Sequence, residues 1–293
     1  MIKFNHYSKL YLEFKEHELK PSTFYKYVNI VNSRISPYFN DLEIKMIKPS
    51  DIKKWLYNID DVGNKSKKHY LGVLSGIFQE ALYDDVISKN PVKQIRPPKY
   101  KRPEISPFSA DEVHQILAQA KNYNYKHYLA IAFYTGMRSG EIIALKKTDI
   151  NFKTNMINVS RSRGIFGEST PKTSYSIRQI PILDILRPFL LDICNSHEYD
   201  YLFITQYKKP YRDNNVFTYK FWQPSLKELN IEYRRPYNTR HTYATNMLYN
   251  DLIVPVKLAQ LLGHANTQMV YDVYVNYLEK QFDNFDKSIQ VYS

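Results

Sequence analysis

TGMRSGEIIAL, residues 135–145, decides the fold, because it joins two apolar segments through a turn that carries a charged pair. The apolar residues 128–134 before it predict a buried helix that ends at Gly136. Arg138 follows this turn directly and precedes a second apolar run that ends at Leu145. We therefore expect Arg138 near the start of the next helix, where backbone amides attract anions and its guanidinium can hold two phosphate oxygens.

Upstream of this stretch, apolar residues recur at helical spacing in three segments, which are residues 24–35, 52–59 and 67–82. Each segment has its apolar positions on one face, as an amphipathic helix requires. These patterns predict a small helical domain over residues 1–97.

A basic, proline-rich segment, RPPKYKRPEISP, separates this domain from the rest of the chain. Its prolines forbid helix and favour an extended connection, so we place a linker at 98–107 and a second domain at 108–293. Lys99, Lys101 and Arg102 in the linker are candidates for contact with a DNA backbone. A plain solvated hinge is an equal alternative.

The second domain begins with a capping box at Ser109 and Glu112, which predicts a helix start. Alternating polar and apolar residues at 156–160 and 176–182 predict a short antiparallel sheet, and the glycines at both ends of 164–167 indicate a loop between them. The predicted fold is therefore mainly α with a small antiparallel β-sheet, in which a helical core-binding domain precedes an α+β catalytic domain.

The charge of the chain points to a polyanion as its partner. Lys and Arg number 41 against 29 Asp and Glu, which gives a formal net charge of +12. The first hundred residues hold 17 of the basic and 11 of the acidic residues, so the excess is spread over both domains. A basic surface of this extent suits nucleic acid. Solvated lysines without a partner are the alternative interpretation.

Cysteine content and hydropathy exclude several classes of protein. The single cysteine, Cys194, rules out an internal disulfide and a multi-cysteine zinc site. The longest apolar run, at 128–134, is too short to span a bilayer, and the N-terminus lacks a signal peptide. We expect a soluble cytoplasmic protein without a membrane partner.

Four motifs occur in a telling order: TGMRSGEIIAL, PKTSYSIRQIPI, TRHTYAT and LLGHANTQMVYDVY. In order and approximate spacing they resemble the tyrosine recombinase (phage integrase) family, and the resemblance covers essentially the whole chain. It implies a site-specific recombinase that breaks and rejoins double-stranded DNA through a 3′-phosphotyrosyl intermediate. No ATP, metal or other cofactor is implied.

The resemblance also implies a role for each motif residue. Arg138, Arg240 and His264 would stabilise the transferring phosphate. Lys172, in the segment where a hairpin tip is expected, would protonate the departing 5′ oxygen, and Lys153 is the less favoured substitute.

The nucleophile must be chosen among 27 tyrosines, and the spacing from His264 makes the choice. Tyr271, Tyr274 and Tyr277 follow His264 on one predicted helix, where successive members are rotated by about 60°. Tyr274 has the spacing closest to the family motif and is our candidate, with Tyr271 as the alternative. A stripe at 270–278 that packs into the core, without chemistry, is the structural alternative.

Three further candidates lie near the two arginines in the sequence: Tyr237 as a catalytic residue, and Glu141 and His241 in supporting roles. The family has a basic residue three positions before Arg240, but this chain has Tyr237, whose phenol, with an ordinary pKa of about 10, is a poor base near neutrality. We therefore expect altered proton handling. Glu141 would support Arg138 without reacting. His241 is expected to cap or pack within the domain, not to react.

Larger assemblies follow only from the resemblance. It implies a homotetramer on paired DNA sites, linked by exchange of a C-terminal segment at about 279–293, for which an intramolecular latch is the alternative. An accessory DNA-bending protein, the choice among integration, excision and resolution, and service to a mobile element or to chromosome maintenance are left open. Rival functions are relaxation of supercoils in the manner of a type IB topoisomerase and DNA binding by a catalytically inactive regulator.

Overall fold

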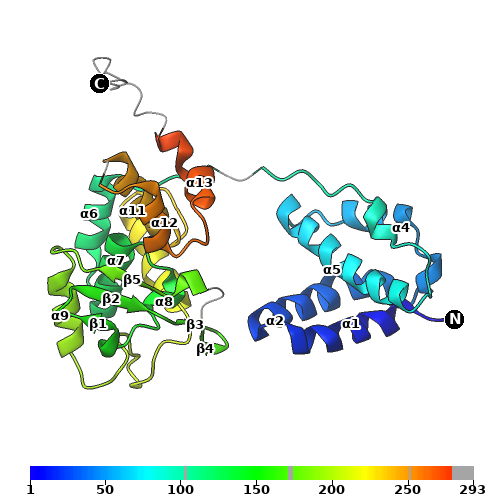
Figure 1. The fold of residues 1–293 in the computed structure, drawn as a ribbon, viewed down its shortest axis with the longest axis horizontal. Helices are drawn as coiled ribbons and strands as arrows, with labels where there is room; N and C mark the ends of the chain where they lie inside the picture. The colour runs from blue at the N-terminus through cyan, green and yellow to red at the C-terminus, as the bar shows by residue number, and fades with distance from the viewer. Residues whose placement is uncertain (102–103, 171–173, 251, 279–293) are drawn as a thin grey trace, which may run out of the picture. The chain divides into compact units, whose positions relative to one another are not determined.

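The chain divides into an N-terminal unit, Met1–Pro103, and a C-terminal unit, Glu104–Ser293. The computed structural model describes residues 1–101, 104–170, 174–250 and 252–278. Figure 1 shows a helical N-terminal unit and a C-terminal unit in which helices surround small sheets. The mainly α fold with small antiparallel sheets is thus confirmed.

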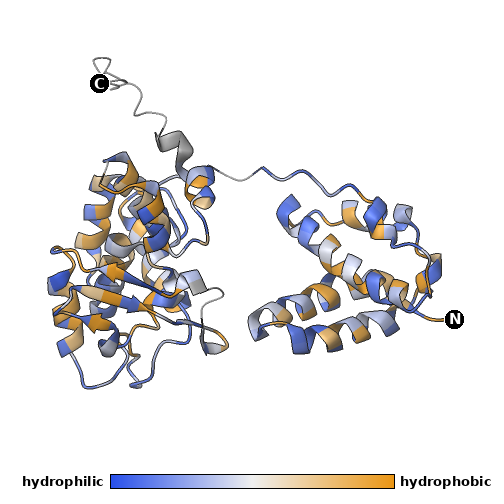
Figure 2. Ribbon diagram, viewed as in Figure 1, coloured by the Kyte–Doolittle hydropathy of each residue, from blue (hydrophilic) through white to orange (hydrophobic). Residues whose placement is uncertain are grey.

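The described part of the N-terminal unit is built from helices. They are α1 (Phe4–Glu18), α2 (Pro21–Ile30), a π-helical turn (Val31–Ile35), α3 (Ser36–Phe39), α4 (Pro49–Tyr57), α5 (Asn64–Tyr83), and short 3₁₀ turns at Ile44–Met46 and Pro91–Gln94. The three predicted amphipathic segments lie in these helices. In Figure 2 apolar residues alternate with polar ones along them, as helices with one buried face require.

The long helix α5 forms the centre of the N-terminal core. Leu74, Ile77 and Phe78 on its inner face are completely buried. Helix α1 packs along α5. A Cβ at Gly76 would lie 2.5 Å from the ring of Tyr11, so a glycine is what lets α1 approach so closely.

The C-terminal unit combines helices with two small sheets. Its helices are α6 (Ala110–Gln119), α7 (Tyr123–Thr135), α8 (Ser139–Ile142), α9 (Arg187–Asn195), a π-helical segment (Phe217–Trp222), α10 (Gln223–Glu228), α11 (Asn238–Tyr249), α12 (Pro255–Leu262) and α13 (Gln268–Leu278), with 3₁₀ turns at Lys147–Asp149 and Ser174–Ser176. Its strands are β1 (Ile150–Asn151), β2 (Met156–Val159), β3 (Ser162–Gly164), β4 (Gly167–Ser169) and β5 (Arg178–Pro181). None of the described helices has the length and apolar content that crossing a membrane would require.

The predicted antiparallel sheet is present and has one strand more than expected. Strand β2 pairs with β5, with Ile157 opposite Ile180, and with the short β1 on its other edge. Both isoleucines are buried, which explains the alternation seen in the sequence. Strand β1 has only two residues, too few for a period to show.

The expected loop at 164–167 is wrong, because these residues close a β-hairpin. Strands β3 and β4 pair from Ser162 opposite Ser169 to Gly164 opposite Gly167. Gly167 has φ +90°, a conformation that glycine adopts without strain at such a tight turn. The two glycines therefore serve the hairpin turn and do not mark an open loop.

Helix ends lie where the sequence places them. Ser109 Oγ accepts from the Glu112 amide at 3.1 Å, and the Glu112 carboxylate accepts from the Ser109 amide at 2.8 Å, so the capping box opens α6. Gly136 ends α7 with φ +63° and Gly263 ends α12 with φ +66°. A Cβ at Gly136 would lie 2.5 Å from the ring of Tyr243, so glycine is required there both for backbone conformation and for space.

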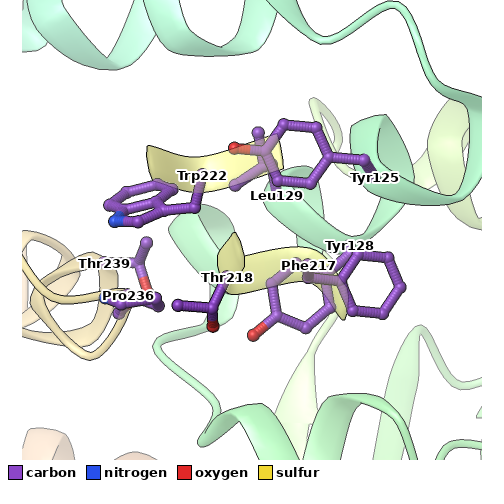
Figure 3. A pocket seen from close by; sticks show the side chains of 8 residues that line it. All are labelled: Tyr125, Tyr128, Leu129, Phe217, Thr218, Trp222, Pro236 and Thr239. Carbon is purple, nitrogen blue, oxygen red and sulfur yellow. Dashed lines mark hydrogen bonds between the residues drawn. The ribbon is translucent and has the colours of Figure 1, made fainter. Parts of the chain in front are cut away.

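An apolar pocket lies inside the C-terminal unit (Figure 3). Its walls are Tyr125, Tyr128, Leu129, Phe217, Thr218, Trp222, Pro236 and Thr239. It has no room for a water molecule, and the rings of Tyr128 and Phe217 stack across it with centroids 4.5 Å apart. This pocket is a packing defect of the core next to the start of α11, not a ligand site.

Candidate functional site

Four chain segments meet where α7, α11, α12 and β5 end or begin. They are the turn after α7, the first turn of α11, the turn after α12, and β5 with the residues just before it. Their positive side chains converge on one carboxylate and on main-chain carbonyls. We call Arg138, Glu141, Arg178 and Arg240 the arginine frame.

Arg240 is the buried centre of the frame, with 1 % of its area exposed. Its guanidinium donates to the carbonyl of Gly136 at 2.8 Å and to that of Leu262 at 2.5 Å, and contacts His264 Nε2 at 2.9 Å. Burial, with the nearby charge of Arg138, lowers the pKa of Arg240 to about 10, so the group stays protonated at neutral pH. A fixed positive charge therefore lies between the ends of two helices.

Glu141 joins two arginines of the frame. Its carboxylate accepts from Arg138 Nη1 at 2.8 Å and from the two Nη atoms of Arg178 at 3.1 and 2.9 Å. Burial acts against ionisation of Glu141, but the bonds from Arg178 and the charges of both arginines outweigh it and keep the pKa of the carboxyl below its usual value. Glu141 thus neutralises one positive charge of the three and leaves the site with an excess.

Arg138 is the arginine of the frame that faces solvent. A third of its side chain is exposed, against 5 % for that of Arg178. It precedes the four-residue helix α8, and its amide donates to Glu141, so the predicted place at a helix start is confirmed. The guanidinium also reaches the Gly263 carbonyl at 3.4 Å, which ties it to the turn that carries His264.

His264 follows the αL residue Gly263 and is held by its neighbours in the frame. Because a guanidinium only donates, the contact with Arg240 makes His264 Nε2 an acceptor and places the ring proton on Nδ1. Burial, and after it the charges of Arg240 and Arg138, lower the pKa of His264 to about 4. Nδ1 has no hydrogen-bond partner among the described residues. The ring is therefore neutral near neutral pH, and its Nδ1 donor is buried.

Tyr274 lies on α13 and is 1 % exposed. Its hydroxyl is 2.9 Å from Nδ1 of His241, which is the next residue after Arg240 on α11. Its ring packs with Val270, Leu258 and Leu262 in an apolar cluster. The residue thus combines the packing of a core stripe with a polar contact at the edge of the site, and Tyr271, the alternative nucleophile, is 42 % exposed on the same helix.

The remaining candidates differ in position. Tyr237 precedes α11, is 46 % exposed, and its ring lies edge-on to that of His241 with centroids 5.0 Å apart. Lys153 is exposed in the β1–β2 turn. Lys99 and Lys101 are exposed. Outside the described residues lie Lys172, Arg102, Tyr277's side chain and the segment 279–293.

Two features of the site were missed from the sequence. Arg178 was passed over as one polar residue of an alternating strand, but its side chain is 5 % exposed and pairs with Glu141. His241 was expected to pack or cap, but it contacts the candidate nucleophile. A partner 33 residues away leaves no mark in the local pattern.

Comparison with protein families gives two matches. The phage integrase family matches residues 107–281, and the SAM-like N-terminal domain of phage integrases matches residues 3–58. A XerC-like tyrosine recombinase from Caldanaerobacter subterraneus is 29 % identical, over 90 % of this chain and 76 % of that protein. The ICEBs1 integrase of Bacillus subtilis is 27 % identical, over 95 % and 80 %.

Solved structures share the fold at low sequence identity. The Tn1549 transposon integrase in complex with a circular intermediate DNA is 19 % identical with a TM-score of 0.78, over 95 % of this chain and 98 % of that chain. A lambda integrase dimer bound to a core site is 21 % identical with a TM-score of 0.77, over 99 % and 81 %. The folds of the two units therefore have counterparts in proteins whose structures were solved on DNA.

Proposed function

Because the chain belongs to the phage integrase family of tyrosine recombinases, which cleave and rejoin DNA, we propose that Tyr274 attacks a DNA phosphate held by Arg138, Arg240 and His264. The attack forms a 3′-phosphotyrosyl bond and releases a 5′ hydroxyl. The new ester keeps the energy of the old one, so a 5′ hydroxyl from a second duplex can reverse the step without ATP. Lys172 would supply the proton to the departing 5′ oxygen.

One observation carries this proposal, which is the convergence of the arginine frame with His264 and the neighbouring tyrosine. Arg240 contacts His264 at 2.9 Å, and the next residue on α11, His241, contacts Tyr274 at 2.9 Å, so adjacent positions on one turn of α11 hold these two residues. Donors fixed before substrate arrives stabilise developing negative charge without reorganisation, which is the largest contribution expected in phosphoryl transfer.

Two basic segments of the N-terminal unit support double-stranded DNA as the substrate, although Arg34 in the first segment is paired with the exposed Asp61. Residues 19–40, which contain α2, include Lys20, Lys26 and Arg34 and no Asp or Glu, and residues 62–79, the first four turns of α5, also have none. Lys65 and Lys68 on α5 are exposed. Such a face can follow a phosphate backbone, whereas α1 carries several glutamates.

The assembly that performs recombination is a homotetramer on two paired sites, in this proposal. A lambda integrase tetramer bound to a Holliday junction is among the solved structures with this fold, at a TM-score of 0.76. Exchange of the 279–293 segment between copies would link the four subunits. Integration, excision or resolution is the expected outcome for the DNA, and an accessory DNA-bending protein would favour one direction.

Trapping of the covalent adduct tests the proposed function. The protein is incubated with a library of duplexes that carry a nick close to each candidate phosphate, so that cleavage releases a short strand and religation fails. We expect a denaturation-resistant adduct with wild type and none with Tyr274→Phe, which removes only the hydroxyl. Sequencing the trapped duplexes gives the site.

Two outcomes would contradict this assignment. An adduct that persists in Tyr274→Phe and disappears in Tyr271→Phe would make Tyr271 the nucleophile. Relaxation of supercoiled plasmids that lack the trapped site would favour topoisomerase activity over recombination. Tyr249→Phe is a matched control, since that tyrosine is exposed at the far end of α11.

A further inference from the structure

The contact between His241 and Tyr274 has the geometry of a proton-transfer pair. The imidazole Nδ1 and the phenolic oxygen are 2.9 Å apart, and the rings lie at 60° to one another with centroids 5.9 Å apart. In the tautomer with its proton on Nε2, His241 accepts the phenolic proton at Nδ1. A phenol ionises only near pH 10 on its own, so a base at this distance matters for attack at neutral pH.

The other described groups of the site are unsuited to accept this proton. Glu141 is held between two arginines, which keep its pKa below the usual value, and both oxygens are occupied. His264 has its pKa lowered to about 4 by burial and by Arg240, and its Nε2 faces that guanidinium. Neither group takes up a proton readily near neutrality.

Two further groups lie near the pair and are equally unsuited. The Tyr237 ring lies edge-on to the His241 ring, but it is itself a phenol and offers no stronger base. Asp272 is exposed two residues before Tyr274 on α13, about 200° around the helix, and accepts a bond from Gln268 at 2.6 Å. Among the described residues, His241 is therefore the base with the right atom at the right distance.

We propose that His241 is the catalytic base of the cleavage step, an inference that rests on the proposed function of Tyr274. As the Tyr274 oxygen bonds to phosphorus, its proton moves to His241 Nδ1 and gives an imidazolium. The bond from phosphorus to the 5′ oxygen breaks, and that oxygen takes a proton from Lys172 or water. In the reverse step the phenolate leaves phosphorus and recovers the proton from His241.

The charges around His241 explain why the base acts only with substrate in place. Titratable groups that adjoin or contact it include Tyr237 just before α11, Arg240 on α11, His264 in the turn after α12, and Tyr274 on α13. The positive charge of Arg240 opposes a second proton on His241. A bound phosphate places negative charge beside Arg240 and so offsets this repulsion.

The test compares His241→Asn with wild type in the adduct assay across pH. The Asn side-chain oxygen can accept the phenolic hydrogen bond but cannot take up its proton, so positioning is kept and base chemistry is lost. We expect a cleavage rate lower by about 10²-fold near neutral pH and the disappearance of the acid limb of the rate profile. Lys172 is unchanged in this variant, so any part of the pH dependence of the cleavage rate that is due to Lys172 should remain.

Controls keep this result separate from the proposed function. His114→Asn replaces an exposed histidine on α6 and is expected to match wild type. If wild type itself gives no adduct, Tyr274 chemistry is wrong, whatever His241 does. If wild type gives the adduct and His241→Asn has the same rate and acid limb, His241 only positions the phenol and our inference is overturned.

Chemical rescue decides the question if the Asn variant melts early. In His241→Ala, added imidazole is expected to restore adduct formation in proportion to its unprotonated fraction, as a replacement base would. Absence of any recovery in a variant that still binds the trapped duplex would also overturn the inference.

Discussion

The arginine frame and helix α13 lie in contact with the same turn of α11 and are built on opposite principles. Arg240 is fixed by two main-chain carbonyls and His264, and Glu141 clamps two further arginines. Helix α13 is the last described element, and its Tyr274 is seated by apolar packing and a contact with a titratable imidazole. The arginine frame holds positive charges in fixed positions, whereas α13 places the Tyr274 hydroxyl beside a group that can accept its proton.

This difference separates two requirements of phosphoryl transfer. Stabilising charge works best when it is rigid, because no reorganisation is then needed at the transition state. A nucleophile must instead form and break bonds during the reaction. Apolar packing, together with a neighbour that can take up and return a proton, suits it better than a rigid network of ion pairs. Substitutions in the two regions should therefore have different signatures, with loss of stability in the frame and loss of rate alone at the pair.

Arg240→Ala should have the largest effect on both readouts. It leaves the Gly136 and Leu262 carbonyls without their donor and removes the central charge, so we expect adduct formation to fall by about 10³-fold. The free energy of unfolding should fall by about 2 to 3 kcal/mol, measured by urea denaturation. Arg240→Lys keeps the charge without the fork, and full activity in that variant would contradict the geometric role given to the guanidinium.

Glu141→Gln tests whether the frame is held by its carboxylate. Loss of the negative charge leaves Arg138 and Arg178 facing one another, and we expect the free energy of unfolding to fall by about 3 kcal/mol. Cleavage should fall by roughly tenfold because Arg138 is displaced. Glu228→Gln, at an exposed position at the end of α10, is the matched control, and equal stability of the two variants would sink the prediction.

His264 should give the frame a pH dependence of stability. Its pKa is lowered from 6.5 to about 4 in the folded chain, so between these values the unfolded chain binds more protons. The contribution of His264 is therefore fully present above 6.5 and is lost as pH falls toward 4. Urea midpoints measured at descending pH should drop less in His264→Gln than in wild type; parallel curves would show that the imidazole is not desolvated.

Tyr271→Phe should have the smallest effect. The residue lies one turn from Tyr274 on α13 but is 42 % exposed, and its hydroxyl is not needed if Tyr274 is the nucleophile. We expect a cleavage rate within about twofold of wild type and an unchanged melting temperature. Loss of the adduct in this variant would show that the nucleophile is Tyr271, on the exposed face of α13.

Local signals in the sequence predicted much of the fold. The capping box at Ser109, the stops at Gly136 and Gly263 and the alternation in β2 and β5 each depend on a few adjacent residues. The hairpin of β3 and β4 was missed because two three-residue strands are too short to show a period.

The residues of the site also divide into those that the sequence predicted and those that it did not. Motif spacing was sufficient to single out Arg138, Arg240 and His264, which the fold brings together through hydrogen bonds. The bond of Arg178 to Glu141 and that of His241 to Tyr274 span 37 and 33 residues, and no local pattern encodes such pairs. They arise only when α11, α13 and β5 have packed.

The oxygens that receive the arginines at Gly136, Leu262, Leu261 and Gly263 all belong to peptide groups. Replacing a neighbouring side chain leaves a peptide oxygen in place, provided that the helix still stops at the same residue. The surrounding sequence can therefore change while the arginine frame persists, which is how chains with fewer than a third of their residues in common can retain one chemistry.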